Sequence, residues 1–292
     1  MGRLAGGQWG RVLVRSMVLL WSVGAACAAD GVSLQPTGIS AHPCPALAAP
    51  SPGLLRYQER LLQPGVHWPG PPDPADVAPG LAAAEGRLHN DWPFSCRYRA
   101  ENAALLDSTR PRAIFIGDSI TEFWELAHPE FFRRGFIDRG ISGQTTGQIL
   151  LRFRQDVIAL NPALVHIMAG TNDIAGNAGP TTLEAIEANI LSMIELAQAH
   201  RIRIVLASTA PAGKFYWSPK VIDPAGQIAM LNRRLEHEAA KLHIVYVDYH
   251  AALSDDRGFM KAPLSNDGVH PNREGYALME PLALRAIQQA LR

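Results

Sequence analysis

The chain has 292 residues, of which 47% are apolar and 18% are charged, so it can bury one sizeable core. This composition excludes a disordered or fibrous chain. Because 27 basic residues balance 27 acidic residues, no net field attracts nucleic acid or an anionic membrane surface. We therefore expect a small or neutral partner and no nucleic acid.

The first 28 residues have the layout of a secretory signal peptide. Arg3, Arg11 and Arg15 precede a short apolar run, and the small residues Ala26 and Ala28 follow it. We therefore expect cleavage after residue 28 and export to the periplasm or the medium. The apolar run is shorter than the roughly 20 residues of a membrane-spanning helix, and no later run reaches that length. No integral membrane segment is expected in the mature protein.

The three cysteines leave two alternatives open. Cleavage after residue 28 removes Cys27 and leaves Cys44 and Cys96 as a pair in an oxidising compartment, where a disulfide between them would persist. The alternative is a lipoprotein that is cleaved before Cys27 and carries a lipid on that thiol. Gly24 argues against the lipoprotein, because such signals usually have a larger aliphatic residue at that position.

Residues 29–89 are rich in proline, alanine and glycine. This composition favours extended or turn conformations over regular elements. We interpret the segment as a linker or a wrapping extension, with one short helix around residues 54–62.

From residue 90 to the C-terminus, short apolar runs alternate with helical patterns. The runs 113–116, 136–141, 164–169, 202–207 and 244–247 have the length and composition of strands buried on both faces. Helices are predicted for 121–127, 146–160, 182–200, 225–242 and 273–291, and for a segment that starts at Asn90 or Asp91 and ends near 106. This alternation indicates an α/β fold, a three-layer α/β/α sandwich with a five-stranded parallel sheet. Its functional site is expected at the carboxyl ends of the strands.

Ser119 follows the first predicted strand directly, in the sequence Gly117-Asp118-Ser119. It stands at the start of a helix, whose positive end favours developing negative charge. Taken alone, this tripeptide is better explained as a helix cap. As a nucleophile, Ser119 would need a histidine base and a carboxylate that orients the base.

His270 is the histidine that we predict as this base. Asp267 precedes it by three residues in a loop before the last helix, so its carboxylate can reach one ring nitrogen while the other faces Ser119. His250, at the end of the fifth strand, is the rival base but has no obvious access to Ser119. His166 falls inside the third apolar run and is predicted to be a core histidine. None of the histidines forms a metal-binding cluster in the sequence.

Two further loops offer hydrogen-bond donors for the oxyanion of acyl transfer. Gly143, after the second strand, presents a backbone N–H that no side chain obstructs. Asn172, after the third strand, presents a side-chain amide. Taken alone, each loop is better explained as a turn or a cap.

Four ordered blocks resemble the SGNH hydrolase superfamily of GDSL-type esterases and acylhydrolases: 117–119, 142–143, 170–173 and 267–270. The similarity runs from about residue 91 to the C-terminus, and within 138–173 it is closest to bacterial extracellular acylhydrolases. Ile120 replaces the leucine of the namesake motif. The absence of Gly-x-Ser-x-Gly around Ser119 argues against an α/β-hydrolase nucleophile elbow. The resulting domain prediction is a signal peptide (1–28), an extension (29–89) and an SGNH hydrolase domain (90–292).

The resemblance implies a flavodoxin-like sheet with strand order 2-1-3-4-5 and no metal or organic cofactor. It assigns Ser119 as nucleophile, His270 as base and Asp267 as the residue that orients the base. The implied oxyanion hole consists of the backbone N–H groups of Ser119 and Gly143 and the amide of Asn172. Asp118 and Asp173, in the first and third blocks, are further candidates for substrate contact.

The expected activity is hydrolysis of a carboxylic ester through an acyl-enzyme, with short acyl groups, especially acetyl, removed from carbohydrate. Phe215, Tyr216 and Trp217, after the fourth strand, either contact the substrate or only pack their loop. The nearest alternative is a lysophospholipase, arylesterase or thioesterase that acts on longer acyl chains. A non-catalytic carbohydrate-binding module and a phosphate site at the Ser119 helix are the alternatives of other classes.

Overall fold

The computed structural model describes residues 43–44, 47, 49–66, 68, 70–106 and 110–292. The predicted signal peptide, including Cys27, lies outside the described residues. The chain divides into two compact units, and the second, Ala46–Arg292, contains every helix and strand discussed below. Cys44 and Cys96 are both disulfide-bonded. Among the helices that the structure describes, none has the length and apolar character needed to cross a membrane.

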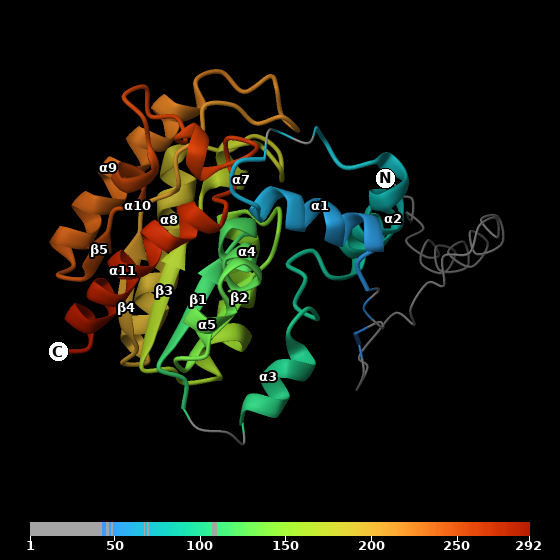
Figure 1. The fold of residues 1–292 in the computed structure, drawn as a ribbon. Coiled ribbons are helices and arrows are strands. Elements are labelled where there is room, and N and C mark those ends of the chain that lie inside the picture. The colour runs from blue at the N-terminus through green and yellow to red at the C-terminus, as the bar shows by residue number, and fades with distance from the viewer. Residues whose placement is uncertain (1–42, 45–46, 48, 67, 69, 107–109) are drawn as a thin grey trace, which may run out of the picture. The chain divides into compact units, whose positions relative to one another are not determined.

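A five-stranded parallel sheet forms the centre of the second unit (Figure 1). Its strands are β1 (Ala113–Gly117), β2 (Phe136–Gly140), β3 (Leu164–Met168), β4 (Arg203–Ala207) and β5 (Val245–Val247). Their order is β2-β1-β3-β4-β5, which confirms the predicted sheet and its order. Gly117 is paired with Gly140 and with Met168, so the carboxyl ends of β2, β1 and β3 meet at one edge of the sheet.

Helices cover both faces of the sheet and complete the predicted three layers. One layer contains α6 (Thr146–Phe153), α8 (Leu183–Ala199) and α9 (Pro224–Lys241). The other contains α4 (Ser119–Ala127), α5 (Pro129–Phe132), α10 (Tyr249–Leu253) and α11 (Arg273–Ala290). Alternate residues of β1 enter the two cores: Ile114 and Ile116 pack with the first layer, and Phe115 packs with the second. Burial on both faces explains why the strands appear as continuous apolar runs.

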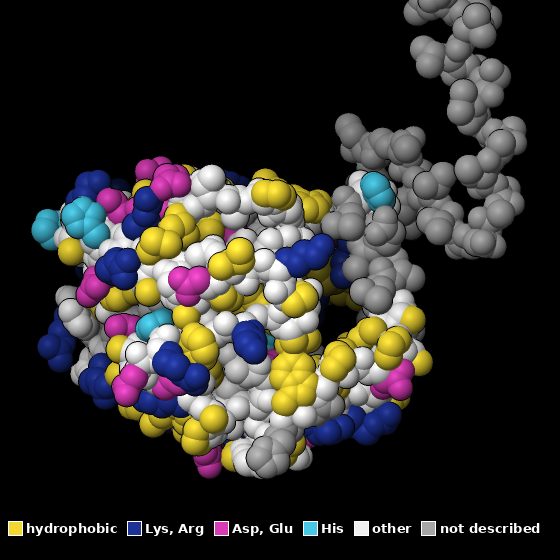
Figure 2. All heavy atoms as spheres, turned by 90° about the horizontal axis from the view of Figure 1, so that it is seen from above, with side chains coloured by type: hydrophobic (Ala, Val, Ile, Leu, Met, Phe, Trp, Pro, Cys, Tyr) yellow, Lys and Arg dark blue, Asp and Glu magenta, His cyan; other side chains and the backbone are white. Residues whose placement is uncertain are grey.

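Three short helical elements lie in the connections between the strands and the longer helices. A π-helical turn, η1 (Arg154–Ile158), continues α6, and α7 (Thr171–Ile174) follows β3 directly. The 3₁₀ turn η2 (Ala262–Leu264) precedes the loop that contains Asp267. On the face shown in Figure 2, basic and acidic side chains are interspersed, in keeping with the balanced charge of the sequence.

Residues 29–89 contain more helix than the sequence predicts. The helix α1 (Pro52–Leu62) agrees with the expected short helix, but α2 (Pro74–Asn90) was not expected. The Asp73 carboxylate accepts a hydrogen bond from the Ala75 N–H (2.8 Å), and Pro74 occupies the first turn, where its missing N–H costs no helical bond. Both helices belong to the same compact unit as the sheet.

The prediction of one helix from residue 90 to about 106 is wrong over its first half. Only α3 (Arg99–Leu106) forms there. The Asp91 carboxylate accepts hydrogen bonds from the N–H groups of Ser95 (2.7 Å) and Cys96 (2.9 Å), which stabilise a series of turns instead of capping a helix.

Candidate active site

Ser119, His270 and Asp267 form one continuous hydrogen-bonded series. Ser119 is the first residue of α4, at the carboxyl end of β1, and its Oγ lies 2.9 Å from Nε2 of His270. The other ring nitrogen of His270, Nδ1, lies 2.6 Å from Oδ2 of Asp267. All three side chains are buried, although the sequence separates Ser119 from His270 by 151 residues. This is the geometry of a hydroxyl, a base and an orienting carboxylate.

The loop around Asp267 fixes the direction of its carboxylate. While Oδ2 faces the imidazole, Oδ1 accepts hydrogen bonds from the N–H groups of Val269 (2.9 Å) and His270 (2.8 Å) and from Oγ of Ser265 (3.2 Å). Gly268 has φ of +78°, a conformation that favours glycine, and this turn brings both N–H groups to the same oxygen. Both carboxylate oxygens therefore have fixed partners.

The opposite charges of Asp267 and His270 stabilise each other, so the carboxylate is favoured in its ionised form and the imidazole in its protonated form. Burial by itself would raise the pKa of Asp267, but the charge of His270 and the hydrogen bonds to it hold the pKa below the ordinary 3.8. Burial by itself would lower the pKa of His270, but Asp267, and to a smaller extent Asp118, raise it above the ordinary 6.5. Burial also raises the pKa of Asp118 to about 6. His270 therefore loses its proton at higher pH than an ordinary histidine does.

The two predicted oxyanion loops lie beside Ser119 and are joined by Asn177. Gly143 has φ of +80° and lines the same cleft as Ser119. Nδ2 of Asn172 donates to Oδ2 of Asp118 (3.2 Å) and to the carbonyl of Gln144 (3.1 Å). Nδ2 of Asn177 donates to Oδ1 of Asn172 (2.8 Å) and to the carbonyl of Gly143 (3.2 Å). Because Asn177 donates to the amide oxygen of Asn172, it fixes the orientation of that amide and therefore the position of its donor nitrogen.

A cleft of about 290 Å³ opens above Ser119 and His270. Its polar side is formed by Ser142, Gly143, Asn172 and Asn177, and its apolar walls come from α1, α4 and the loop after β4. No Lys, Arg, Asp or Glu among the described residues lines it. A larger hollow of about 610 Å³, lined by residues such as Arg201 and His243, contains none of the predicted site residues. The cleft at Ser119 is thus suited to an uncharged ligand.

The predicted aromatic contacts divide between the cleft and the core. Tyr216 and Trp217 line the cleft, and Nε1 of Trp217 donates to Oδ1 of Asn177 (2.9 Å). Phe215 is only 2% exposed and belongs to the core, where its ring centroid lies 5.2 Å from that of Trp217. The structure therefore favours Tyr216 and Trp217 over Phe215 as substrate contacts.

The two acidic candidates, Asp118 and Asp173, use their carboxylates inside the protein and do not line the cleft. Oδ1 of Asp118 accepts the N–H of Ile120 (2.9 Å) and caps α4. The Asp173 carboxylate accepts the N–H (2.8 Å) and the hydroxyl (2.6 Å) of Thr146 at the start of α6. Both carboxylates thus hold the loops of the site in place, and neither is exposed to a ligand in the cleft.

The two other histidines weighed from the sequence, His166 and His250, are not among the residues that line the cleft. His166 is fully buried in β3, where its Nε2 lies 2.9 Å from the Tyr249 hydroxyl and its ring stacks on Phe115. Its place in the core is as predicted, and burial lowers the pKa of His166 to about 3, so it remains neutral there. The rival base His250 lies in α10 and is not among the described residues that line the cleft.

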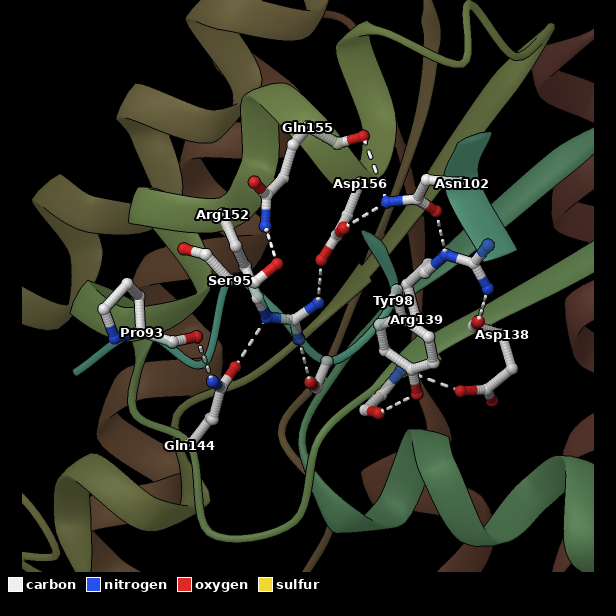
Figure 3. Close-up of polar contacts among 12 residues, drawn as sticks. Pro93, Ser95, Tyr98, Asn102, Asp138, Arg139, Gln144, Arg152, Gln155 and Asp156 are labelled. Atoms are coloured by element: carbon white, nitrogen blue, oxygen red, sulfur yellow. Dashed lines mark hydrogen bonds and ion pairs between the residues drawn. The ribbon is translucent and has the colours of Figure 1, made fainter. Parts of the chain in front are cut away.

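Sequence reasoning missed a buried arginine, Arg152, that connects the loops of the site (Figure 3). Its guanidinium donates to the carbonyl of Gly117 (2.9 Å), to Oε1 of Gln144 (2.6 Å) and to Oδ2 of Asp156 (2.9 Å). Gly117 ends the strand that leads to Ser119, and Gln144 follows Gly143. One side chain in α6 therefore connects the two loops that contribute Ser119 and Gly143 to the cleft.

Replacing Arg152 with methionine should lower the free energy of unfolding by about 3–5 kcal/mol, because Asp156 then remains buried without its cation. The matched control is Arg154→Met. Arg154 lies two residues further along the same helical run, and its side chain is exposed, so the free energy of unfolding should change by no more than about 0.5 kcal/mol. Urea denaturation of both variants measures the difference. Equal stabilities for the two variants would contradict this role for Arg152.

Comparison with known proteins identifies the family of this chain. Residues 115–278 match the model of the GDSL-like Lipase/Acylhydrolase family. The crystal structure of a proposed acylhydrolase from Bacteroides fragilis NCTC 9343 is 46% identical, with a TM-score of 0.67, over 69% of this chain and 99% of that one. A GDSL-like lipase from Bacteroides thetaiotaomicron VPI-5482 is 43% identical, with a TM-score of 0.66, over 68% of this chain and all of that one (100%).

An acetylxylan esterase of Geobacillus stearothermophilus is 25% identical over 210 residues, which cover 60% of this chain and 93% of that protein. The family match spans more than half of the chain and includes the positions of Ser119 and His270. The chain therefore belongs to the GDSL-like lipase/acylhydrolase family of the SGNH hydrolase superfamily and is a carboxylic ester hydrolase.

Proposed function

We propose that this enzyme removes short acyl groups, above all acetyl, from a carbohydrate through an acyl-enzyme on Ser119. The observation that carries the proposal is the series from Ser119 Oγ to His270 Nε2 (2.9 Å) and from His270 Nδ1 to Asp267 Oδ2 (2.6 Å), at the base of an uncharged cleft. The similarity to an acetylxylan esterase supports the choice of acyl group and of acceptor.

In the proposed first step, His270 Nε2 takes the proton of Ser119 as Oγ attacks the ester carbonyl. The oxyanion accepts hydrogen bonds from the N–H groups of Ser119 and Gly143 and from the Asn172 amide. The bond from carbon to the alcohol oxygen then breaks, and His270 returns the proton to the departing alcohol. A water molecule, deprotonated by the same histidine, attacks the acyl-enzyme and releases the carboxylic acid and Ser119.

Both N–H groups of the Asn172 amide have protein acceptors before substrate binds. We propose that the oxyanion displaces the longer contact, the one of 3.2 Å to Asp118. The hydrogen bond from Asn177 to Oδ1 of Asn172 holds the amide orientation in which the Asn172 nitrogen is the donor next to Asp118. One such donor typically lowers the barrier by about 3–4 kcal/mol.

The cleft lining supports a neutral, compact substrate. Tyr57, Tyr216 and Trp217 give it aromatic surface. Among the described residues, no Lys, Arg, Asp or Glu lines the cleft, so none can pair with an ionic head group. A volume of about 290 Å³ is at the lower end of small-molecule sites, which suits a ring with a short acyl group better than a long chain.

We also propose that the enzyme is exported, with residues 1–28 as its signal peptide, 29–89 as an extension and 90–292 as the hydrolase domain. The charged, apolar and small-residue layout of the first 28 residues supports this location. The disulfide-bonded state of Cys44 and Cys96 is typical of an oxidising compartment.

Turnover of 4-nitrophenyl esters, from acetate to long-chain acids, tests the activity. Acetate release from acetylated xylan and related glycans tests the acceptor. We expect the highest kcat/KM for acetate, and labelling by a serine-directed phosphonate that peptide mass spectrometry locates on Ser119. A preference for long acyl chains would instead assign the enzyme to lipid esters. Glycan binding without turnover would assign it to the binding modules.

The acidic limb of the kcat/KM profile should lie above about pH 6.5, the ordinary pKa of histidine. Catalysis needs neutral His270. Because the pKa of His270 is raised, the neutral form, and with it the activity, appears only at higher pH. Because Asp118 contributes to this increase, Asp118→Asn should move the limb to lower pH, while the exposed Asp256→Asn should not. Rates measured from about pH 5 to 9 locate the limb. A limb below pH 6.5, or one that Asp118→Asn leaves in place, would contradict this assignment.

A further inference from the structure

The helix α1 lies outside the family match yet forms part of the cleft. The family model begins at residue 115, whereas α1 spans Pro52–Leu62. The Bacteroides fragilis structure is matched over 99% of its length by only 69% of this chain, so about three tenths of this chain have no counterpart in it. Figure 1 shows α1 at the same end of the sheet as α7, which follows the carboxyl end of β3.

One face of α1 lines the cleft. Leu54, Tyr57, Gln58 and Leu61 are among the lining residues, and their spacing of i, i+3, i+4 and i+7 places them on one side of the helix. Leu55 points elsewhere and is 50% exposed. The helix therefore presents one defined side, formed by these four residues, to the cleft.

The loop that contains Asp267 holds α1 in place through the neighbouring residue, Asn266. Nδ2 of Asn266 donates to the carbonyls of Arg60 (2.8 Å), Leu61 (3.0 Å) and Gln63 (2.8 Å). Carbonyls at the end of a helix lack helical partners, so this buried amide satisfies the end of α1. An ion pair between Glu59 and Arg273 (2.9 Å) adds a second attachment.

The contacts of His270 indicate which half of the ester faces this wall. In the proposed reaction His270 returns its proton to the departing alcohol, so the alcohol must lie on the His270 side of Ser119. The rings of Phe123 and Trp217 flank His270, with centroids 5.2 Å and 6.4 Å from its own. The helix α1 is bound at Asn266, next to Asp267, and the hydroxyl of its Tyr57 lies 3.5 Å from that of Tyr216. The alcohol half is thus enclosed by α1 together with the aromatic loop after β4.

We propose that α1 is a specificity helix that bounds the alcohol half of the ester, with Leu54 limiting the size of the alcohol. This inference rests on the proposed ester hydrolysis at Ser119. Leu54 is seven residues from Leu61, or about 10 Å along the helix, so it stands at the far end of the wall from the Asn266 attachment. The lining suits a neutral alcohol that places C–H groups against Tyr57, such as a sugar ring.

Adjacent leucines provide a matched test. Leu54→Trp places a larger side chain in the cleft, whereas Leu55→Trp places the same side chain on the exposed face of the same helix. Each variant is assayed on two ester series, acetates of increasingly large alcohols up to an acetylated disaccharide, and 4-nitrophenyl esters of increasingly long acids. Leu54→Ala, which enlarges the cleft, serves as the opposite change.

Leu54→Trp should lower kcat/KM for the acetate of the largest alcohol at least about tenfold relative to methyl acetate. Its preference along the acid series should stay within about twofold of that of the unmodified enzyme, and Leu54→Ala should favour the larger alcohols. If Leu54→Trp behaves like Leu55→Trp, or changes the preference for acids instead of alcohols, the inference is wrong. Absence of turnover by the unmodified enzyme in both series would instead refute the proposed function, so the two failures are distinguishable.

Discussion

Replacement of Ser119 with alanine is expected to lower kcat for 4-nitrophenyl acetate by a factor on the order of 10⁶. Without Oγ no acyl-enzyme forms, and His270 has no proton to accept at Nε2. The residual rate should come from the oxyanion donors and from substrate binding, which do not need the hydroxyl. Steady-state kinetics and loss of the pre-steady-state burst measure the effect.

Ser142 provides the control in the same cleft. Its hydroxyl donates to Glu122 and not to His270, and its backbone N–H donates to the same carboxylate (2.8 Å), a hydrogen bond that does not need the hydroxyl. We expect Ser142→Ala to retain kcat within about tenfold, and both variants to unfold near the temperature of the unmodified protein. If Ser119→Ala kept more than about one hundredth of the activity, the nucleophile would have to be another residue.

The sequence predicts the sheet and the central residues well because their signals are local. Each strand is buried on both faces, so runs such as 113–116 are apolar without interruption and mark β1 directly. Ser119 and Asn172 each follow a strand end, and parallel strands end at one edge of the sheet. This topology, with the resemblance that four blocks carry, is enough to bring Ser119 near His270.

The residues that sequence reasoning missed depend on contacts between distant segments. Asn266 binds carbonyls more than 200 positions earlier in the chain, from Arg60 to Gln63, and nothing near residue 266 indicates this. Arg152 has the sequence character of a charged helix surface, and only its three buried acceptors reveal its position. Phe215 and Trp217 are separated by one residue, and only their side-chain directions decide which one reaches the cleft.

Asp267→Asn is expected to lower kcat by about 10⁴-fold, because an amide cannot satisfy both sides of the Asp267 position. If its NH₂ faces His270, Nδ1 must accept, the ring proton moves to Nε2, and His270 can no longer take the proton of Ser119. If the amide is flipped, its NH₂ points at the N–H groups of Val269 and His270, so donors face donors in a buried site.

Ser265→Ala separates this tautomer effect from simple loosening of the loop. It removes the hydroxyl that donates to Oδ1 of Asp267 (3.2 Å) but leaves the carboxylate, its charge and both backbone donors in place. We expect its kcat to fall by less than about a hundredfold, against about 10⁴-fold for Asp267→Asn. Comparable losses in the two variants would mean that Asp267 acts by holding its loop, and that the protonation state of His270 is set by other groups.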